Sequence, residues 1–206
     1  MSNPVKSTCK LCRREGVSLC GRENCAFKKR GYLPGVHGPK SIKRKPRLSS
    51  YGIQLREKQK TKRLYNLSEK QFRRYFEKAN NSPFNTAEYL VQLLETRLDN
   101  TIYRLGFAKT RRQARQMVSH RFIQINGQTV DIPSYKVSIG EEITIKTNKE
   151  KTVLVTELIK RLAKVETPKW LNLDPKTVTG KITSQPEGED LRQIFDPTLT
   201  VEFYSR

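Results

Sequence analysis

The sequence has little of what secreted, membrane-spanning or catalytic proteins usually contain. Its 206 residues include two histidines, one tryptophan and four cysteines, and hydrophobic residues make up 35% of the chain. No segment approaches the roughly 18 consecutive apolar residues that a membrane-spanning helix requires. The first residues, MSNPVKSTCKLC, contain no apolar stretch of the kind found in signal peptides. We therefore expect a cytoplasmic protein with small hydrophobic cores and reduced thiols.

Acidic residues are scarce in two blocks of the chain. In total, 41 Lys and Arg stand against 20 Asp and Glu, which gives a formal net charge of +21. Residues 1–63 hold 18 basic and 3 acidic residues, and residues 104–130 hold 6 and none. The other segments are balanced. A solvated face or an anionic membrane surface could explain one basic block, but two blocks carried on neutral segments favour two contact surfaces for a nucleic acid.

The pattern of apolar residues predicts an irregular basic arm followed by helices. Residues 1–48 show neither helical nor strand periodicity and are rich in Cys, Gly, Pro, Lys and Arg. Residues 51–64 form a basic helix in this interpretation. Ser68 and Gln71 then form a capping box for an amphipathic helix. Thr86 is predicted to cap a further helix, whose leucines recur every four residues as far as Ile102.

A third capped helix is expected to lead into a hairpin. Thr110 is its predicted N-cap, and the helix carries Arg111, Arg112 and Arg115 on one side, away from its apolar residues. The Asn-Gly pair at 126–127 between two short apolar runs is the strongest local signal for a β-hairpin. The other elements that the pattern predicts are strands at 137–139, 142–146 and 199–204 and a short helix at 156–164.

All four cysteines lie close together in the sequence, as Cys9, Cys12, Cys20 and Cys25. Two close pairs joined by a short loop can place four thiolates around one tetrahedral ion, and Zn²⁺ is the usual occupant. Metal binding can also supply the folding energy that so polar a segment lacks. An iron–sulfur cluster uses the same ligands, and redox-active or metal-free thiols are a third interpretation.

Basic side chains in the two blocks are the candidate RNA contacts, because guanidinium groups pair with phosphate oxygens and a helix N-terminus adds backbone donors. His120 has an ordinary alternative as an exposed or capping histidine. The first block contributes Arg13, Arg14, Lys28, Lys29, Arg30, His37, Lys40, Lys43, Arg44, Lys45, Arg47, Arg56, Lys58, Lys60, Lys62 and Arg63. The second block contributes Lys109, Thr110, Arg111, Arg112, Arg115, Ser119, His120 and Arg121. The absence of a base-stacking aromatic platform in the pattern favours recognition of RNA shape and backbone.

Short segments throughout the chain resemble a known family. RLDN at 97–100, YRLGFA at 103–108, RRQARQ at 111–116, ING at 125–127 and PSY at 133–135 resemble the RNA-binding domain named after small-subunit ribosomal protein four. CKLCRREG at 9–16, PGVHG at 34–38, LREKQK at 55–60 and VEFYSR at 201–206 extend the resemblance to the bacterial-type members of that ribosomal protein family. These segments occur in the same order along the chain as in that family, from one end to the other.

The resemblance implies an α+β protein. We expect a mostly helical N-terminal region with a Cys-rich metal knuckle and an extended basic arm, followed by an RNA-binding domain of helices packed on a small antiparallel sheet. The expected divisions are a knuckle and arm at 1–48, a helical rRNA-binding region at 49–96 that segment 190–206 completes, the RNA-binding domain at 97–165, and a turn-rich extension at 166–206.

The resemblance also implies a structural, non-enzymatic component of the small ribosomal subunit in a bacterium or in an organelle that encodes its own ribosome. Such a protein binds small-subunit rRNA early in assembly, contacts neighbouring proteins including protein five, and lies near the path of incoming mRNA, where it supports translational accuracy. Two alternatives are a free zinc-containing RNA-binding regulator and an RNA-modifying enzyme that shares the RNA-binding domain. The enzyme would use Asp99, which is more simply explained as a helix-capping residue or as a partner of an arginine.

Overall fold

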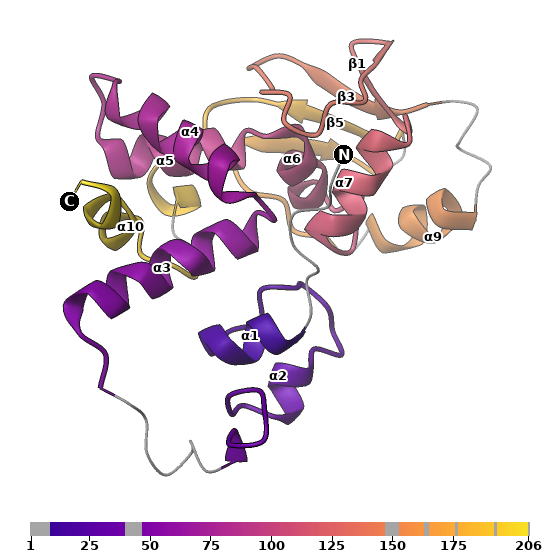
Figure 1. Ribbon diagram of the computed structural model, residues 1–206. Coiled ribbons are helices and arrows are strands. Elements are labelled where there is room, and N and C mark those ends of the chain that lie inside the picture. Colours follow the sequence, from indigo (N-terminus) through magenta and orange to yellow (C-terminus); the bar gives the residue numbers. More distant parts are fainter. Residues whose placement is uncertain are drawn as a thin grey trace. The chain divides into compact units, whose positions relative to one another are not determined.

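The computed structural model of the chain describes residues 9–39, 47–146, 153–162, 165–175, 177–191 and 193–205. The chain divides into two compact units, which we call unit 1 (Met1–Val91 with Gln193–Arg206) and unit 2 (Gln92–Arg192). Helices and a small antiparallel sheet together confirm the α+β prediction (Figure 1).

Unit 1 is helical in its described part. Its elements are α1 (Cys9–Glu15), α2 (Ala26–Lys29), α3 (Ser50–Leu64), α4 (Glu69–Asn80), the first part of α5 (Thr86–Glu95) and α10 (Pro197–Tyr204). The capping box at Ser68 and Gln71 is confirmed, with both hydrogen bonds present. The cap of α5 is Asn85 and not Thr86 as predicted, because the Asn85 side chain accepts a hydrogen bond from the backbone N–H of Ala87 at 3.0 Å.

The C-terminal segment corrects one prediction, since 199–204 is helical and not a strand. The Asp196 side chain accepts hydrogen bonds from the N–H groups of Thr198 and Leu199, at 2.8 and 3.4 Å. Pro197 occupies the first helical turn, where its missing N–H has no cost. These start signals outweigh the strand-like alternation of the residues that follow.

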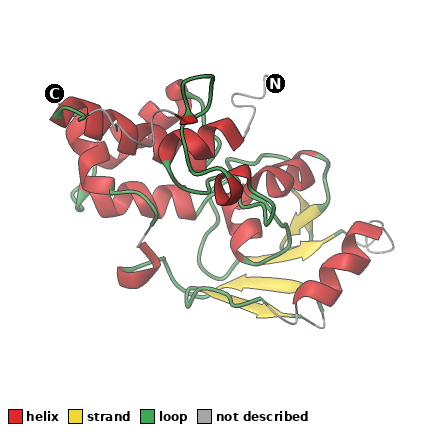
Figure 2. Ribbon diagram, turned by 90° about the horizontal axis from the view of Figure 1, so that it is seen from below, coloured by secondary structure: helices red, strands yellow, loops and turns green. Residues whose placement is uncertain are grey.

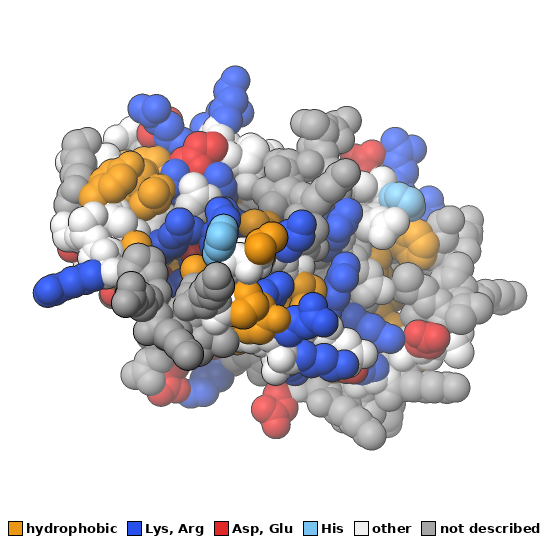
Figure 3. Space-filling view, turned by 60° about the horizontal axis from the view of Figure 1, so that its bottom comes forward, with side chains coloured by type: hydrophobic (Ala, Val, Ile, Leu, Met, Phe, Trp, Pro, Cys, Tyr) orange, Lys and Arg blue, Asp and Glu red, His pale blue; other side chains and the backbone are white. Residues whose placement is uncertain are grey.

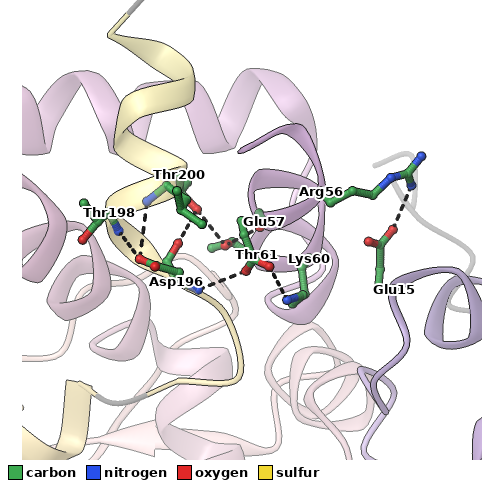
Figure 4. Close-up of polar contacts among 9 residues, drawn as sticks. Glu15, Arg56, Glu57, Lys60, Thr61, Asp196, Thr198 and Thr200 are labelled. Carbon is green, nitrogen blue, oxygen red and sulfur yellow. Dashed lines mark hydrogen bonds and ion pairs between the residues drawn. The ribbon is translucent and has the colours of Figure 1, made fainter. Parts of the chain in front are cut away.

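Helix α10 packs against α3 and α4 through aromatic and polar contacts. The Tyr204 ring stacks on Phe76 at 4.8 Å between centroids, and its hydroxyl donates to Glu69 at 2.7 Å. The hydroxyls of Thr61 and Thr200 meet at 3.3 Å in a fully buried position (Figure 4). The C-terminal helix thus covers apolar and hydroxyl surface on α3 and α4 that would otherwise be exposed.

Unit 2 combines helices with a five-stranded sheet. The helices are the rest of α5, α6 (Leu98–Arg104), α7 (Arg111–Ser119), α9 (Val153–Leu162) and the 3-10 turn η2 (Gly188–Leu191). The strands, β1 (Ile123–Ile125), β2 (Gln128–Thr129), β3 (Glu142–Ile145), β4 (Leu171–Asp174) and β5 (Thr179–Ile182), lie in the order β2-β1-β3-β5-β4, and all neighbours are antiparallel.

The β1–β2 hairpin is confirmed, and its turn residues have the left-handed backbone that such a tight turn needs. Asn126 has φ 48° and Gly127 has φ 81°, which matches the geometry of a type I′ turn. The β4–β5 hairpin was not predicted, because residues 166–206 have a turn-rich pattern. These two strands add to the sheet beside β3, so that it has five strands. The strand predicted at 142–146 is confirmed as β3, whereas 137–139 is not a strand.

The single helix predicted from Thr86 to Ile102 is two helices. Helix α5 ends at Glu95 and α6 begins at Leu98. The intervening backbone is extended at Arg97, which forms a β-bridge with Lys136, while the C=O of Thr96 accepts a hydrogen bond from Val137 N–H at 3.0 Å. Tertiary pairing with the 136–137 segment therefore interrupts a continuous apolar repeat.

One face of the sheet carries the hydrophobic core of unit 2. Along β1 and β3 the buried residues alternate with more exposed ones, as expected for an antiparallel sheet with one solvated face. Ile123 and Ile143 on the buried face are fully covered and belong to one cluster with Leu98, Val118 and Trp170. Figure 2 shows helices beside the strands, and this core fixes α6 and α7 to the sheet.

We predict that Glu69 makes the stability of the protein depend on pH. Burial alone would raise its pKa, but hydrogen bonds from Lys58, Lys62 and Tyr204 lower it from the ordinary 4.5 to about 2. A depressed carboxyl pKa contributes stability above about pH 4.5, and this contribution is lost as the pH falls toward about 2. Because the Glu69 side chain is about half exposed, solvent screens these contacts. We therefore expect them to contribute about 1 kcal/mol to the free energy of unfolding at pH 7.

Denaturant unfolding of the wild type and of Glu69→Gln, measured from pH 7 to pH 3, checks this expectation. The variant should be less stable at pH 7, and the gap should close as the pH falls. A difference that stays constant over this range would contradict the assignment. Glu77→Gln, which removes the acidic partner of an exposed pair with Arg73 on α4, is the matched control.

Candidate nucleic-acid interface and metal site

The cysteines gather at the N-terminal end of unit 1. Cys9 and Cys12 lie on α1, Cys25 is the N-cap residue of α2, and Cys20 lies in the loop between these helices. The Sγ atoms of Cys9, Cys20 and Cys25 all lie within 4.8 Å of one another, so that these three could hold a metal ion. All four cysteines are free of disulfides.

Cys12 adjoins the other thiols from a buried position. Burial raises its pKa to about 12, and the nearby Cys20 thiol contributes to the rise. Burial also acts to raise the pKa of Cys25, but hydrogen bonds from Ser18 and from the backbone of Phe27 outweigh it and lower the pKa to about 7. Three of the four thiols thus lie close enough together to hold a metal ion, and Cys12 contacts Cys20 and Cys25 beside them.

Arg13 organises the loop that follows α2 and is therefore engaged within the protein. Its Nε and Nη2 atoms donate to the backbone carbonyls of Tyr32 and Leu33 at 2.9 and 3.0 Å. Its guanidinium also lies 4.6 Å from the centre of the Tyr32 ring. Arg13 thus stabilises the 32–33 segment, and its predicted role as an RNA contact stays a prediction.

Glu15 joins the cysteine-bearing region to helix α3. Its side chain is only 1% exposed and pairs with Arg56 at 3.4 Å and, more closely, with Arg63. The contact with Arg56 is visible in Figure 4. A buried carboxylate between two guanidinium groups offsets their mutual repulsion and fixes α1 against α3.

The lysines of α3 are also engaged by carboxylates. Lys58 is 5% exposed, donates to Glu69 at 2.5 Å and lies 4.7 Å from the centre of the Phe203 ring. Lys58 is therefore paired within the protein, and its role as an RNA contact stays a prediction. Lys62 donates to the other oxygen of Glu69 at 2.8 Å, and Lys60 donates to Glu57 at 2.5 Å.

Other predicted contacts of the first block lie exposed on unit 1. They are Arg14, Lys28, Lys29, Arg30, His37 and Arg47. Lys40, Lys43, Arg44 and Lys45 lie outside the described residues. On the face drawn in Figure 3, Lys and Arg side chains are prominent, and hydrophobic side chains are exposed between some of them.

Helix α7 carries the second block, and its arginines differ in their surroundings. Arg112 is exposed. Arg111 is partly buried: its Nε donates to the Asn100 side chain at 2.7 Å, and its guanidinium lies 4.4 Å from the centre of the Tyr103 ring. Arg115 is partly buried and approaches the Asp99 carboxylate at 3.6 Å. Arg111 and Arg115 are thus held by α6, which the helical pattern alone did not indicate.

The residues flanking α7 complete the predicted surface. Thr110 is confirmed as the N-cap and accepts a hydrogen bond from Gln113 N–H at 3.2 Å. Ser119 and His120 are exposed, and His120 is the C-cap residue of α7. Lys109 and Arg121 are exposed and pair with acidic groups at 3.6 and 3.0 Å.

Sequence reasoning missed the polar residues that hold these arginines. Asp99 accepts hydrogen bonds from Arg97 at 3.0 and 2.7 Å, which confirms the interpretation of Asp99 as an arginine partner. Glu95, Asn100 and Tyr103 were not singled out. One signal was available, because Glu95 and Asp99 are the last acidic residues before the acid-free block 104–130.

Comparisons with known proteins show the family of the chain. Residues 5–95 match the family described as the ribosomal protein S4/S9 N-terminal domain, and residues 96–143 match the S4 domain. The small ribosomal subunit proteins uS4 of Caldicellulosiruptor saccharolyticus and of Acidobacterium capsulatum are each 46% identical to the chain, over the full length of both partners. The chain belongs to the uS4 family. The uS4 protein of Acetivibrio thermocellus is 43% identical, again over full length.

The uS4 family confirms the resemblance seen in the sequence segments, including the ribosomal character that they implied. The relatives' names describe ribosomal proteins and give no metal. Within the part of the chain that the structure describes, no helix is both long and apolar enough to cross a membrane.

We predict that removing the Glu15 carboxylate destabilises unit 1. Glu15→Ala leaves Arg56 and Arg63 close together with no acid between them, and we expect a loss of about 2 kcal/mol in the free energy of unfolding. Urea denaturation of the full chain measures it. Glu23→Ala is the control, since Glu23 is exposed in the same region. Equal stabilities of the two variants would show that the ion pairs of Glu15 with Arg56 and Arg63 do not contribute to the free energy of unfolding.

Proposed function

We propose that this chain is a structural constituent of the small ribosomal subunit, where it binds small-subunit rRNA early and helps to nucleate assembly. The observation that carries the proposal is full-length similarity, at 46% identity, to proteins named small ribosomal subunit protein uS4. The net charge of +21 supports it, because a polyanion must offset such a surplus in a compact particle. Its place is the ribosome of the bacterial cytoplasm, since the relatives come from bacteria.

The proposed RNA surface consists of those residues of the two basic blocks that are exposed or, as Arg111 and Arg115 are, partly buried. On unit 1 we assign Arg14, Lys28, Lys29, Arg30, His37 and Arg47, together with the undescribed Lys40, Lys43, Arg44 and Lys45. On unit 2 we assign Lys109, Arg111, Arg112, Arg115, Ser119, His120 and Arg121. Arg13, Arg56, Lys60, Lys62 and Arg63 have internal partners and contribute mainly by keeping the charged surface in place.

We further propose that the four cysteines bind one structural Zn²⁺. Supporting the proposal are the proximity of Cys9, Cys20 and Cys25 and the adjoining Cys12 thiol. Four thiolates leave no open coordination position, so the ion would stabilise α1 and α2 rather than catalyse a reaction. Lys10, Arg13 and Arg14 would offset the negative charge of such a centre.

Contacts with neighbouring small-subunit proteins, including protein five, and a position near the path of incoming mRNA are part of the same proposal. They rest on the uS4 family resemblance alone. In that position the protein would support translational accuracy through its neighbours.

Two other functions are less well supported. An RNA-modifying enzyme would need Asp99 as a reactive carboxylate, yet Asp99 is buried and accepts two hydrogen bonds from Arg97. A free zinc-containing regulator would share the same basic surface but would remain outside the ribosome.

Sedimentation of cell lysate in a sucrose gradient at physiological salt tests the proposed function. The chain should travel with small subunits and assembled ribosomes. Recovery only among free proteins would contradict the proposal and favour the regulator. Replacing both Lys28 and Lys29 by Ala should raise the free fraction, because both side chains are exposed.

Metal analysis of the purified chain, combined with its visible absorption spectrum, tests the zinc proposal. We expect about one zinc per chain and no visible absorption, and Cys20→Ser should lower the zinc content. Iron with visible absorption would indicate a cluster instead. A metal-free chain that is fully folded would contradict both.

A further inference from the structure

A buried polar chain links the acidic residue at the end of α5 to an arginine of α7, entirely within unit 2. The Glu95 side chain is 1% exposed. Its carboxylate accepts hydrogen bonds from Arg104 Nε and Nη2 at 2.8 and 3.0 Å, and from Asn100 Nδ2 at 2.8 Å. Arg104 thereby fixes the carboxylate as a rigid acceptor for the Asn100 amide.

Asn100 uses both ends of its amide in this chain. It is 2% exposed, and its Nδ2 also donates to the backbone carbonyl of Glu95 at 3.0 Å. Its Oδ1 accepts from Arg111 Nε at 2.7 Å. With donors facing the acid and the oxygen facing the guanidinium, only one orientation of the amide satisfies all partners.

The Arg111 guanidinium is consequently restrained from two sides. Asn100 accepts from its Nε, while Tyr103, one helical turn further along α6, offers its ring at 4.4 Å from the guanidinium carbon. A free arginine side chain loses considerable rotamer freedom when it binds a phosphate, and a side chain restrained beforehand loses less.

We propose that Asn100 is a positioning residue for RNA binding, which holds Arg111 in the orientation that meets an RNA phosphate. The inference rests on the proposed function, because it assumes that Arg111 contacts RNA. Arg115 does not have the same restraint, since its closest approach to Asp99, 3.6 Å, exceeds hydrogen-bonding distance. The exposed Arg112 is the natural control.

A double-mutant cycle on RNA affinity separates positioning from a purely structural role. The full chain is titrated with a small-subunit rRNA fragment that contains the multi-helix junction. We expect Asn100→Ala to weaken binding about fivefold and Arg111→Ala about tenfold, because a hydrogen bond to a charged group is at stake. The double variant should bind no more weakly than Arg111→Ala. In the Arg112→Ala background, Asn100→Ala should still cost about fivefold.

The possible failures differ from one another. If Asn100→Ala weakens binding equally with and without Arg111, Asn100 acts only through the fold, and the inference is overturned while the RNA role of Arg111 stands. If neither Arg111→Ala nor Arg112→Ala changes the affinity, the proposed RNA surface on α7 fails, and the inference fails with it.

Two further measurements protect the test against a poorly folded Asn100→Ala variant. Arg111→Lys keeps the charge but loses the Nε donor, so it should bind more weakly than the wild type; unchanged affinity would overturn the inference. Without RNA, the Arg111 Nε–H resonance should exchange slowly with solvent in the wild type and rapidly in Asn100→Leu or Asn100→Ala, whichever retains the native amide spectrum, because neither side chain can accept a hydrogen bond. Rapid exchange in the wild type would also overturn it.

Discussion

The arrangement of this protein depends on where its few carboxylates lie. The first 63 residues hold 18 basic and 3 acidic side chains. Each carboxylate therefore matters, because it offsets part of the repulsion among the basic side chains. Glu15 is buried between two arginines of α3. Glu57 pairs with Lys60 and accepts a hydrogen bond from the backbone N–H of Asp196, which fixes the start of α10 (Figure 4). The carboxylates thus organise the basic helix and the C-terminal helix at once.

The same arrangement recurs in unit 2, where Glu95 and Asp99 hold the side chains of Arg104 and Arg97. In both units, a few buried carboxylates restrain the basic side chains near them, and other basic side chains remain exposed. Restrained cations keep their geometry, and exposed ones are available to attract a polyanion. A basic protein can in this way be folded and charged at the same time.

Local signals in the sequence predicted much of the fold. The capping box at Ser68, the cap at Thr110 and the Asn-Gly turn each act within a few residues, and all are present. The break between α5 and α6 escaped prediction because pairing with the 136–137 segment, some forty residues away, causes it. Local propensity cannot register such a contact.

For the candidate site too, features set by residues close in the sequence were predictable, and features set by distant residues were not. The cysteine spacing indicated a convergent set of thiols, because all four lie within one short segment. The division of the cations into internal and exposed groups did not follow from the sequence, since Glu15 lies 41 and 48 residues from its partners Arg56 and Arg63. Charge counts located the two basic blocks but did not separate the cations that are paired within the protein from those that are exposed.

The salt dependence of rRNA affinity tests this division most directly. It should be measured for alanine variants of three exposed cations, Lys28, Lys29 and Arg112, and of three paired ones, Arg56, Lys58 and Arg63. Each exposed variant should lower the slope of log affinity against log salt by about 0.7 to 0.9 and leave the melting temperature unchanged. The paired variants should lower the melting temperature and leave the slope unchanged. Equal reductions of the slope in both groups would contradict the account.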